Sequence, residues 1–522
     1  MDAKSQPQGI CHQSGNGKMI FNPFLIFPLL LCLVLLYERR RDRGLPPGPR
    51  RLPIIGNLHQ APSELPWRTY QEWTKKYGPI FSVQYGLTTV IMLGTHESAD
   101  ALLNKKSSIY SSRPRLVMAG ELVTKGFHVL LMTYGQKWRT HQKMQASCLN
   151  IRQSQAYRPL QDLESKQLMH DLLHSDDFAK LYHRYTASLM FGLSYGKRSP
   201  AGDEPEIKGA DQVNANFLDA AKVGRNIVDA LPVLNYLPAF LAPWKHRAER
   251  FWRLESSLHM SNLRFGMSTP SWNFTKQITK MKEAKDMPEI EVAYDIGIIY
   301  EAGLDTTNMA LEIFTLAAVL NPGFVETAQR ELDAVVGSDR LPTFDDQHNL
   351  PYITAVVKET LRWRPVSAGG IPHSVITDDE YMGYRIPKGA TVIGNHWSIH
   401  MDEAVFAEPQ KFLPERWLEN PNLPLHAFGF GRRVCTGQHV SQNSMFIIVA
   451  RLLWAFRFEH VYKNGVRLEI DDMAFTSGFN SRPLPFQVHF EPRSAAHKSV
   501  VEKSWAEADK DINNILSQMG TV

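Results

Sequence analysis

One cysteine, Cys435, stands in a short segment of glycine, arginine and aromatic residues, directly before an apolar run at mostly helical spacing, 440–454. A cysteine at the start of a helix lies at the positive end of the helix dipole, near backbone N–H groups that have no intrahelical partner. Such groups stabilise a sulfur anion. Gly431 and Gly437 allow the backbone to bend sharply and to approach a flat ligand. The segment therefore predicts a thiolate that ligates a soft metal.

The alternative is a buried, inert cysteine in a turn, which is the usual fate of a free cysteine. The pattern Phe-x-x-Gly-x-Arg-x-Cys-x-Gly, from Phe428 to Gly437, fixes five positions at set spacing and favours the metal site. Arg433 can pair with an anionic substituent of the ligand, and Arg432 can face a protein partner. This segment resembles the haem-binding loop of the cytochromes P450, the haem-thiolate monooxygenases. By that resemblance the cofactor is haem b with Cys435 as the axial ligand, and Phe428, Gly431, Arg433 and Gly437 belong to its binding loop.

The composition of the chain is that of an ordinary globular protein. The 522 residues are 43% apolar and 21% charged, which is typical of a globular protein with a large core. The net charge of +5 is mixed in sign along the chain and does not indicate a nucleic-acid partner. The four cysteines are scattered, which argues against a disulfide framework and favours a reducing compartment.

The N-terminal residues predict a membrane anchor. After a polar tail, 1–18, the run 19–37 carries no charge and is about long enough to cross a bilayer. A cleaved signal peptide is the competing interpretation, but no small-residue cleavage site follows the run. Four arginines come just after it, against two lysines before it, so the positive-inside rule places the body in the cytosol. We therefore expect a single-pass protein of the endoplasmic reticulum membrane; the possible glycosylation acceptor Asn273-Phe-Thr275 argues for the lumen but is a pattern that occurs by chance.

The remaining chain reads as one unit. A basic, proline-rich hinge, 38–56, precedes a catalytic domain, 57–495, and a polar tail, 496–522. The domain is mainly α with small β-sheets and no confident internal boundary. Expected helices are 66–77, one capped by Thr95, 134–148, much of 160–252, 289–320, 325–336 and 352–363; expected strands are 80–85, 89–93, short ones in 366–395 and others near 475–490; 111–133 is expected to be an irregular loop.

The segment Leu231–Trp244 is apolar and aromatic but contains three prolines, so it is not a core helix. It is either a loop packed on the protein's own surface or, as we hypothesise, a loop that dips into the membrane beside the anchor. Tryptophan and basic residues prefer the membrane interface, and Lys245, His246 and Arg247 follow directly.

A second group of residues lies inside the expected long helix, at Ala302-Gly-Leu-Asp-Thr-Thr307. Glycine and consecutive threonines are poor choices in a helix interior, and Thr306 can hydrogen-bond the carbonyl of Ala302. Taken alone, this is ordinary helix polarity. Beside the cysteine loop it resembles the family's dioxygen-activating helix, which implies that Thr306 positions dioxygen and a water while Asp305 helps to deliver protons.

Glu359 and Arg362 share one helix face, a pairing that is common and weak on surfaces. By resemblance to the family they form a buried ion network with Arg416, which supports the cysteine loop. His373 and Trp138 match the places where the family contacts the haem propionates. Gln142 stands where that family has arginine, so Arg139, His141 and Lys143 are candidates to replace its charge.

The resemblance covers most of the body and is strongest to fungal secondary-metabolite members of the microsomal class. It implies the cytochrome P450 fold, a single N-terminal transmembrane helix, and electrons from NADPH-cytochrome P450 reductase, since the chain has no flavin or dinucleotide fingerprint. We expect a hydrophobic polycyclic substrate, such as a polyketide, indole alkaloid or terpenoid. Its pocket is expected to be lined from 111–133, 366–371 and 477–479, by Ile299 and Ala302, with Gly369 and Gly370 leaving space for rings. The alternatives are a haem-thiolate isomerase or dehydratase that does not use NADPH, and a non-catalytic haem sensor.

Overall fold

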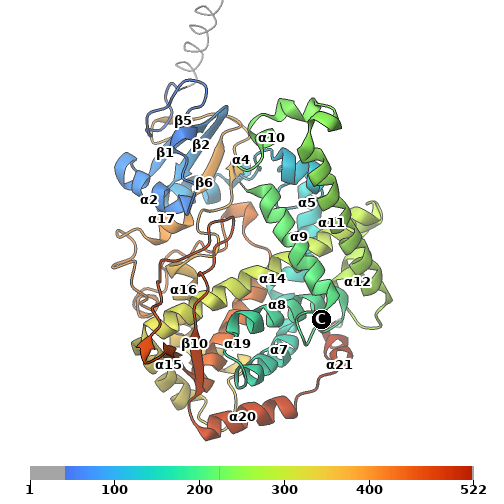
Figure 1. The fold of residues 1–522 in the computed structure, drawn as a ribbon, viewed down its shortest axis with the longest axis vertical. Helices are drawn as coiled ribbons and strands as arrows, with labels where there is room; N and C mark the ends of the chain where they lie inside the picture. The colour runs from blue at the N-terminus through green and yellow to red at the C-terminus, as the bar shows by residue number, and fades with distance from the viewer. Residues whose placement is uncertain (1–41, 223, 520–522) are drawn as a thin grey trace, which may run out of the picture.

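The computed structural model describes residues 42–222 and 224–519, which form a helix-rich body with one sheet near its upper end and a further strand pair lower down (Figure 1). The expected mainly α architecture is confirmed. The helices are α2 Pro66–Tyr77, α3 His96–Ala99, α4 Ser107–Tyr110, α5 Gln136–Leu149, α6 Ile151–Ala156, α7 Arg158–Leu172, α8 Phe178–Tyr195, α9 Pro205–Ala221, α10 Ile227–Ala230, α11 Pro243–Ser268, α12 Phe274–Thr279, α13 Lys282–Lys285, α14 Glu289–Leu320, α15 Pro322–Val335, α16 Pro351–Trp363, α17 His396–His400, α18 Arg416–Glu419, α19 Gln438–Ala455, α20 Ala495–Ala506 and α21 Ile512–Ser517.

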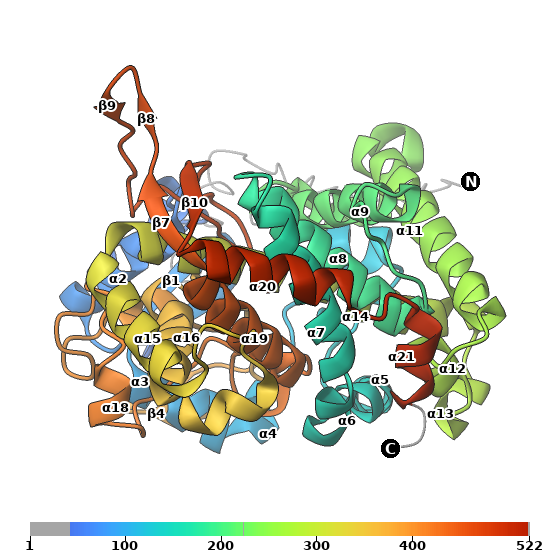
Figure 2. The ribbon, with the colours of Figure 1, turned by 90° about the horizontal axis from the view of Figure 1, so that it is seen from below.

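The strands are β1 Ile80–Tyr85, β2 Thr88–Leu93, β3 His373–Ser374, β4 Asp379–Tyr381, β5 Tyr384–Ile386, β6 Thr391–Gly394, β7 Phe456–His460, β8 Tyr462–Lys463, β9 Val466–Arg467 and β10 Val488–Pro492. One four-stranded sheet has the order β1-β2-β6-β3, in which β2 and β6 run parallel and the other pairs antiparallel. The remaining strands form two-stranded pairs, and the β8–β9 hairpin projects from the body (Figure 2).

Helix α14 is the central helix of the fold. It is apolar on most of its circumference and buried along most of its length, as expected of a helix enclosed by others. It ends at Leu320 because Pro322 starts the next helix, and α15 leaves at 103°. Within the described residues no single helix is long and apolar enough to cross a membrane; only the bent pair α14–α15 qualifies on length and composition. The expected anchor, 19–37, lies outside the described residues.

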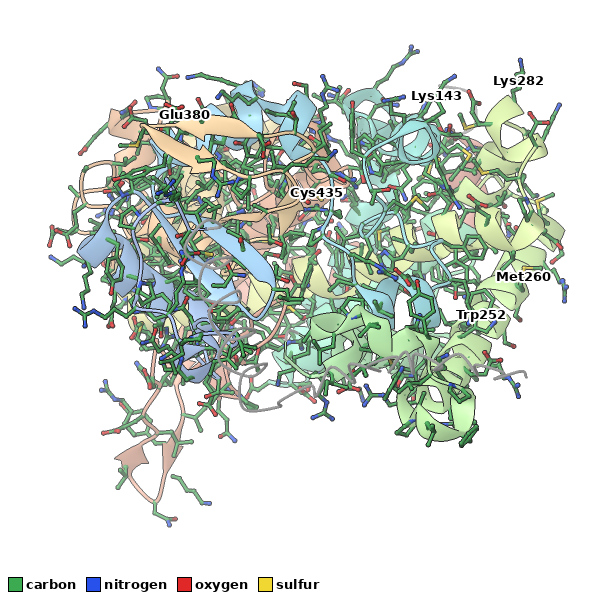
Figure 3. The ribbon with its side chains drawn as sticks, turned by 90° about the horizontal axis from the view of Figure 1, so that it is seen from above. Lys143, Trp252, Met260, Lys282, Glu380 and Cys435 are labelled. Atoms are coloured by element: carbon green, nitrogen blue, oxygen red, sulfur yellow. The ribbon has the colours of Figure 1, made fainter. Side chains whose placement is uncertain are left out.

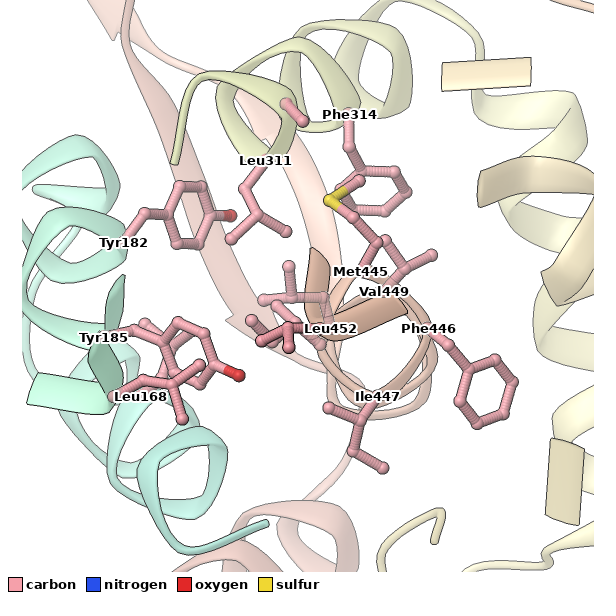
Figure 4. Packing of buried hydrophobic residues seen from close by; sticks show 14 of the residues in the cluster. Leu168, Tyr182, Tyr185, Leu311, Phe314, Met445, Phe446, Ile447, Val449 and Leu452 are labelled. Carbon is pink, nitrogen blue, oxygen red and sulfur yellow. The ribbon is translucent and has the colours of Figure 1, made fainter. Parts of the chain in front are cut away.

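The core joins α14, α8, α7 and α19, whose buried side chains interdigitate in Figure 4. Two buried tyrosines of α8 satisfy their hydroxyls within this core. Tyr182 bonds to Thr315 of α14 at 2.8 Å, and Tyr185 donates to Ser444 of α19 at 2.9 Å. These contacts hold α19, which follows Cys435, in a fixed position against α14.

The proline-rich segment after residue 42 is not a free spacer in the structure. The Ser82 N–H donates to the Pro47 carbonyl at 2.8 Å, and a Cβ at Gly48 would lie 2.0 Å from the Ser82 carbonyl oxygen. The glycine therefore allows the segment to lie directly along β1. The described part of the expected hinge, 42–56, thus packs on the sheet.

The expected polar tail is also part of the body. Helix α20 packs against α7, and Val501, Ile515 and Leu516 are buried in the main core. Only a few residues of this largely polar segment are buried, so its overall polarity concealed the packing. Of the expected strands near 475–490, only β10 and one isolated bridge between Phe475 and Pro483 form.

Candidate active site

A cavity of about 340 Å³ lies inside the protein between α14 and the cysteine loop, a volume in the range of small-molecule sites. In the view of Figure 3, Cys435 lies near the middle of the molecule's outline. The cavity wall is mainly apolar. It includes most of the residues singled out from the sequence: Trp138, Gln142, Ala302, Asp305, Thr306, His373, Phe428, Arg433, Cys435 and Gly437.

Cys435 faces this cavity and its side chain remains accessible, although protein surrounds it. Its N–H donates to the Phe428 carbonyl at 2.9 Å, which closes the loop. Burial raises the pKa of the Cys435 thiol, while the N–H groups of Gly437 and Gln438 at the start of α19 lower it. The protein alone therefore does not keep the sulfur ionised; a metal ion that it coordinates would do so.

Gly431 is required by the path of the loop. Its φ is +50°, and a Cβ there would lie 2.3 Å from the Leu103 carbonyl oxygen. Its N–H donates to Asn104 Oδ1 at 2.7 Å, which fastens the loop to 100–105. Gly437 has an ordinary φ of −83°, and a Cβ there would lie 3.9 Å from the sulfur, so it keeps the surroundings of Cys435 open.

Two guanidinium groups, that of Arg113 buried and that of Arg433 half-buried, form a cationic wall of the cavity. Arg433 lies over the Trp138 ring at 4.3 Å and donates to the Ser111, Val129 and Met132 carbonyls. Arg113 donates to the Leu130, Ile371 and Pro372 carbonyls. Within the described residues neither forms an ion pair with a carboxylate. Burial lowers the pKa of Arg433 to about 10 and that of Arg113 well below its usual value. Two cations, one buried and one half-buried, that lack a carboxylate partner among the described residues call for an anionic ligand.

Arg113 was missed at the sequence level. It lies in the expected irregular loop, where no periodicity marks the direction of a side chain.

The three residues considered as replacements for a charge at position 142 all make contacts away from the cavity. His141 lies 2.9 Å from Glu291, Lys143 pairs with Glu283, and Arg139 stacks on Tyr134, whereas Gln142 itself lines the cavity.

His373 lines the cavity, but its bonding differs from what a propionate donor needs. Its Nδ1 lies 2.8 Å from the Tyr110 carbonyl oxygen and must carry the proton, since a carbonyl only accepts. Burial and the nearby Arg113 hold the pKa of His373 well below its usual value. The neutral ring therefore offers Nε2 as an acceptor, so Arg113 and Arg433 suit an anion better than His373 does.

These observations fit a haem. The site offers an accessible cysteine sulfur, two arginines without carboxylate partners in the described part of the chain and a mainly apolar wall, which match the iron, the propionates and the porphyrin face.

We expect Arg113→Gln to release haem about 10- to 100-fold faster than the unmodified protein, because a charged hydrogen bond to a propionate is lost. Transfer of haem to an excess of an apo-globin acceptor measures this rate. Arg139→Gln is the matched control, since Arg139 is exposed and does not line the cavity. Equal rates for the Arg113 variant and the unmodified protein would remove Arg113 from the site.

On the α14 side of the cavity, the Thr306 hydroxyl lies beside the small residue Ala302. The Thr306 hydroxyl donates to the Ala302 carbonyl at 2.9 Å, as expected from the sequence, and Ala302 is exposed to the cavity. Its neighbour Gly303 does not widen the groove. A Cβ at Gly303 would lie 2.7 Å from Met190, so this glycine instead admits a side chain of α8.

Asp305 is held by two partners that sequence analysis did not identify. Asn214 of α9 donates to its carboxylate, and Arg482 lies 3.2 Å away in an ion pair. Arg482 also forms an ion pair with Glu312, about two turns further along α14, at 3.3 Å. No sequence signal links residue 482 to residue 305, because the contact depends on how the C-terminal segment folds over α14.

The ion network expected behind the site is present. Glu359 accepts from Arg362 at 2.7 and 2.8 Å, from Arg416 at 3.2 Å and from Trp417 at 2.9 Å. Arg362 also donates to the His400 carbonyl at 2.9 Å, and His400 accepts from the His426 N–H at 3.1 Å. This chain of bonds connects α16 to the segment that carries the cysteine loop.

Part of the expected pocket lining was wrong. The structure places Val366, Ile371, Ile299 and Phe479 on the cavity wall, together with parts of 111–133. Gly369 and Gly370 are not among the residues that line it. Gly370 has a φ of +74°, and a Cβ there would lie 2.0 Å from the Gly394 carbonyl, so this glycine serves the backbone and does not make room for a substrate.

Comparisons with known proteins place this geometry in a family. The cytochrome P450 family model matches residues 46–490. Cytochrome P450 monooxygenase FrzL of Cladobotryum sp is 42% identical over 503 residues, covering 96% of this chain and 98% of that protein. Cytochrome P450 monooxygenase aneD of Aspergillus aculeatus is 44% identical, covering 94% and 96%. A zebrafish cytochrome P450 solved with abiraterone shares the fold, with a TM-score of 0.68, 23% identity, and coverage of 82% of this chain and 100% of that one.

Proposed function

The chain belongs to the cytochrome P450 family, and from that premise we propose that it is a monooxygenase of fungal secondary metabolism that acts on a hydrophobic small molecule. The reaction inserts one atom of dioxygen into the substrate. Two electrons and two protons reduce the other atom to water. The observation that carries the proposal is the accessible Cys435 sulfur, facing Thr306 and Asp305 across one mainly apolar cavity.

A haem held by Cys435 supplies the activation of dioxygen, and thiolate ligation favours cleavage of the O–O bond. Arg113 and Arg433 would hold the propionates of that haem and so orient it. Because the Thr306 hydroxyl donates to Ala302, its oxygen is left to accept a hydrogen bond from a water. Asp305, fixed by Arg482 and Asn214, holds a carboxylate one residue away that can pass protons to that water. The apolar wall excludes bulk water from the reacting atoms.

Expression of the protein with a reductase, followed by feeding of candidate metabolites and mass spectrometry, tests this function. We expect products that carry one added oxygen derived from dioxygen and that require NADPH. Conversion of a substrate without NADPH would instead indicate an isomerase or dehydratase. Haem spectra without any substrate-dependent NADPH use would indicate a sensor.

We assign the electron donor as NADPH-cytochrome P450 reductase. An exposed basic pair supports this choice: Arg432 hydrogen-bonds Tyr134 and stacks on its ring, and Arg139 stacks on the same ring at 5.6 Å. Such a pair suits an acidic partner surface. Charge reversal at Arg432 is expected to raise the reductase concentration needed for half-maximal turnover, and an unchanged value would count against this docking site.

We also place the protein on the cytosolic face of the endoplasmic reticulum membrane, anchored by 19–37. An exposed apolar surface supports this proposal. It comprises Leu52, Ile55, Leu58, Ile227, Leu231, Val233, Tyr236, Phe240 and Leu241. Tyr236 and Phe240 are 87% and 80% exposed. Both contributing segments lie at the upper edge of the molecule in Figure 1, so they can meet one membrane surface together.

In a form that lacks residues 1–44, replacing Val233, Tyr236 and Phe240 by serine is expected to weaken binding to phospholipid vesicles by roughly tenfold or more, since buried apolar area is lost. Vesicle sedimentation measures the bound fraction. The control replaces Tyr462 and Val466, which are equally apolar and exposed on the β8–β9 hairpin. Unchanged binding after the first set of changes would refute insertion of this loop.

A further inference from the structure

One carboxyl group on the cavity wall has no role in the chemistry described above. Glu301 lies on α14, one turn before Asp305, and is only 8% exposed. It lines the cavity, and its Oε1 accepts no hydrogen bond within the described residues. Asp305, also on this wall, is compensated by Arg482, whereas Glu301 forms no ion pair with lysine or arginine in the described part of the chain.

The partner of Glu301 is a histidine from a neighbouring helix. His259 of α11 is 1% exposed, and its Nε2 lies 3.7 Å from Glu301 and 3.8 Å from Glu255. Neither ring nitrogen has a hydrogen-bond partner among the described residues. Position 297 admits this ring: a Cβ on Gly297 would lie 2.1 Å from His259 Nδ1. In Figure 3, α11 forms the edge of the molecule that carries the labelled Trp252 and Met260, and Trp252 stacks on Tyr294, whose ring meets His259 edge to face.

The cluster carries more acid than base. With both carboxyls ionised and His259 protonated, it still holds one uncompensated negative charge. Burial raises the pKa of Glu301 to about 8, the cation of His259 lowers it and the neighbouring Glu255 raises it. Burial lowers the pKa of His259, but the two carboxylates outweigh burial and raise it overall. An empty cavity therefore keeps a proton on this group near neutral pH.

We propose that Glu301 is the recognition point for a basic nitrogen on the substrate, held as an ammonium against the carboxylate. This inference rests on the proposed monooxygenase function and narrows its substrate class. An aliphatic amine, which in lysine has a pKa of about 10.4, is already an ammonium ion near neutral pH, so the Glu301 carboxyl releases its proton to the solvent as the ammonium binds. The ammonium supplies the missing positive charge and pairs with the Glu301 carboxylate from the cavity, while Oε1 stays turned toward His259.

A divalent cation is the competing occupant, because Glu255, His259 and Glu301 lie close enough to hold one. The cavity favours a substrate group instead. Glu301 lines the cavity, whereas Glu255 and His259 do not, so a molecule in the cavity reaches only one of the three groups of this cluster. An amine needs that single contact, while a metal ion would need all three.

The test uses the haem-loaded protein and two probes of equal shape. One is dimethyl(phenylbutyl)amine, whose bulky tertiary nitrogen is a poor iron ligand; the other is the hydrocarbon in which CH replaces that nitrogen. Calorimetry measures the Kd of each. The variants are Glu301→Gln, Glu301→Asp, which keeps the charge, and Glu289→Gln, which removes an exposed carboxylate from the same helix.

We expect the unmodified enzyme and Glu289→Gln to bind the amine at least about tenfold more tightly than the hydrocarbon. Glu301→Gln should weaken amine binding by about 10- to 100-fold and leave the hydrocarbon unchanged, and Glu301→Asp should retain a preference for the amine. Equal affinity of the unmodified enzyme for both probes would overturn the inference whatever the variants do. So would an equimolar second metal in the purified enzyme that is lost in Glu301→Gln. The reduced carbon monoxide spectrum of the same samples reports on the proposed function separately, since it does not depend on Glu301.

Discussion

Replacing Glu359 with glutamine is expected to yield a protein that folds poorly and holds little haem. The Glu359 carboxylate is fully buried and accepts hydrogen bonds from Arg362, Arg416, Trp417 and the Leu413 N–H. An amide of the same shape removes the only carboxylate in this cluster and turns a donor toward two guanidinium groups. Breaking a buried ion pair in this way costs roughly 3–5 kcal/mol.

The measurements are the haem-to-protein ratio after purification and the midpoint of thermal unfolding. Glu419→Gln is the matched control, because Glu419 is an exposed carboxylate on the adjacent α18. Full haem occupancy and unchanged stability in the Glu359 variant would refute a supporting role for this network.

The second large effect is expected at the sulfur itself. Cys435→Ser should reduce NADPH-dependent oxygenation to the background of the reductase alone. A hydroxyl is a poor ligand for haem iron and does not supply the electron density that favours O–O cleavage. Product formation with reductase and NADPH measures this loss, at haem contents matched between samples.

Cys148→Ala is a control that the chain itself offers. Cys148 is fully buried, and burial raises the pKa of its thiol to about 12. It is therefore an inert cysteine, the alternative that the sequence analysis considered for Cys435. Its loss should leave oxygenation intact in whatever protein folds. Activity that survives in Cys435→Ser but not in Cys148→Ala would mean that Cys148, and not Cys435, is the required cysteine.

Local rules predicted much of the fold. The bounds of α14 and β1 were predicted as observed, and Thr95 caps α3 by accepting from the Ser98 N–H. These features depend on short-range signals, namely an apolar helix bounded by prolines, alternating strand residues and a capping side chain. The C-terminal helices were harder to predict, because burial of Val501 and Leu516 depends on the surface of α7, which no local pattern contains.

The residues of the site also divide into those that a short segment marks and those that depend on long-range contacts. Cys435 was singled out by the spacing of its loop, and Thr306 and Glu359 by the resemblance of their segments to the family. Arg113 and Arg482 were not, since each acts through contacts made by an irregular segment across more than a hundred residues. His373 was placed on the correct wall, but its ring orientation was decided by the Tyr110 carbonyl, which spacing cannot reveal.

The central claim is that the sulfur of Cys435 is the axial ligand of a haem. The spectrum of the reduced protein under carbon monoxide tests it most directly, in the unmodified chain and in Cys435→Ser. The account predicts a Soret band at the long-wavelength position that only thiolate-bound haem produces, present in the first and absent from the second. A band at the shorter wavelength of nitrogen-ligated haem in the unmodified chain, or a long-wavelength band that persists in the serine variant, would contradict it.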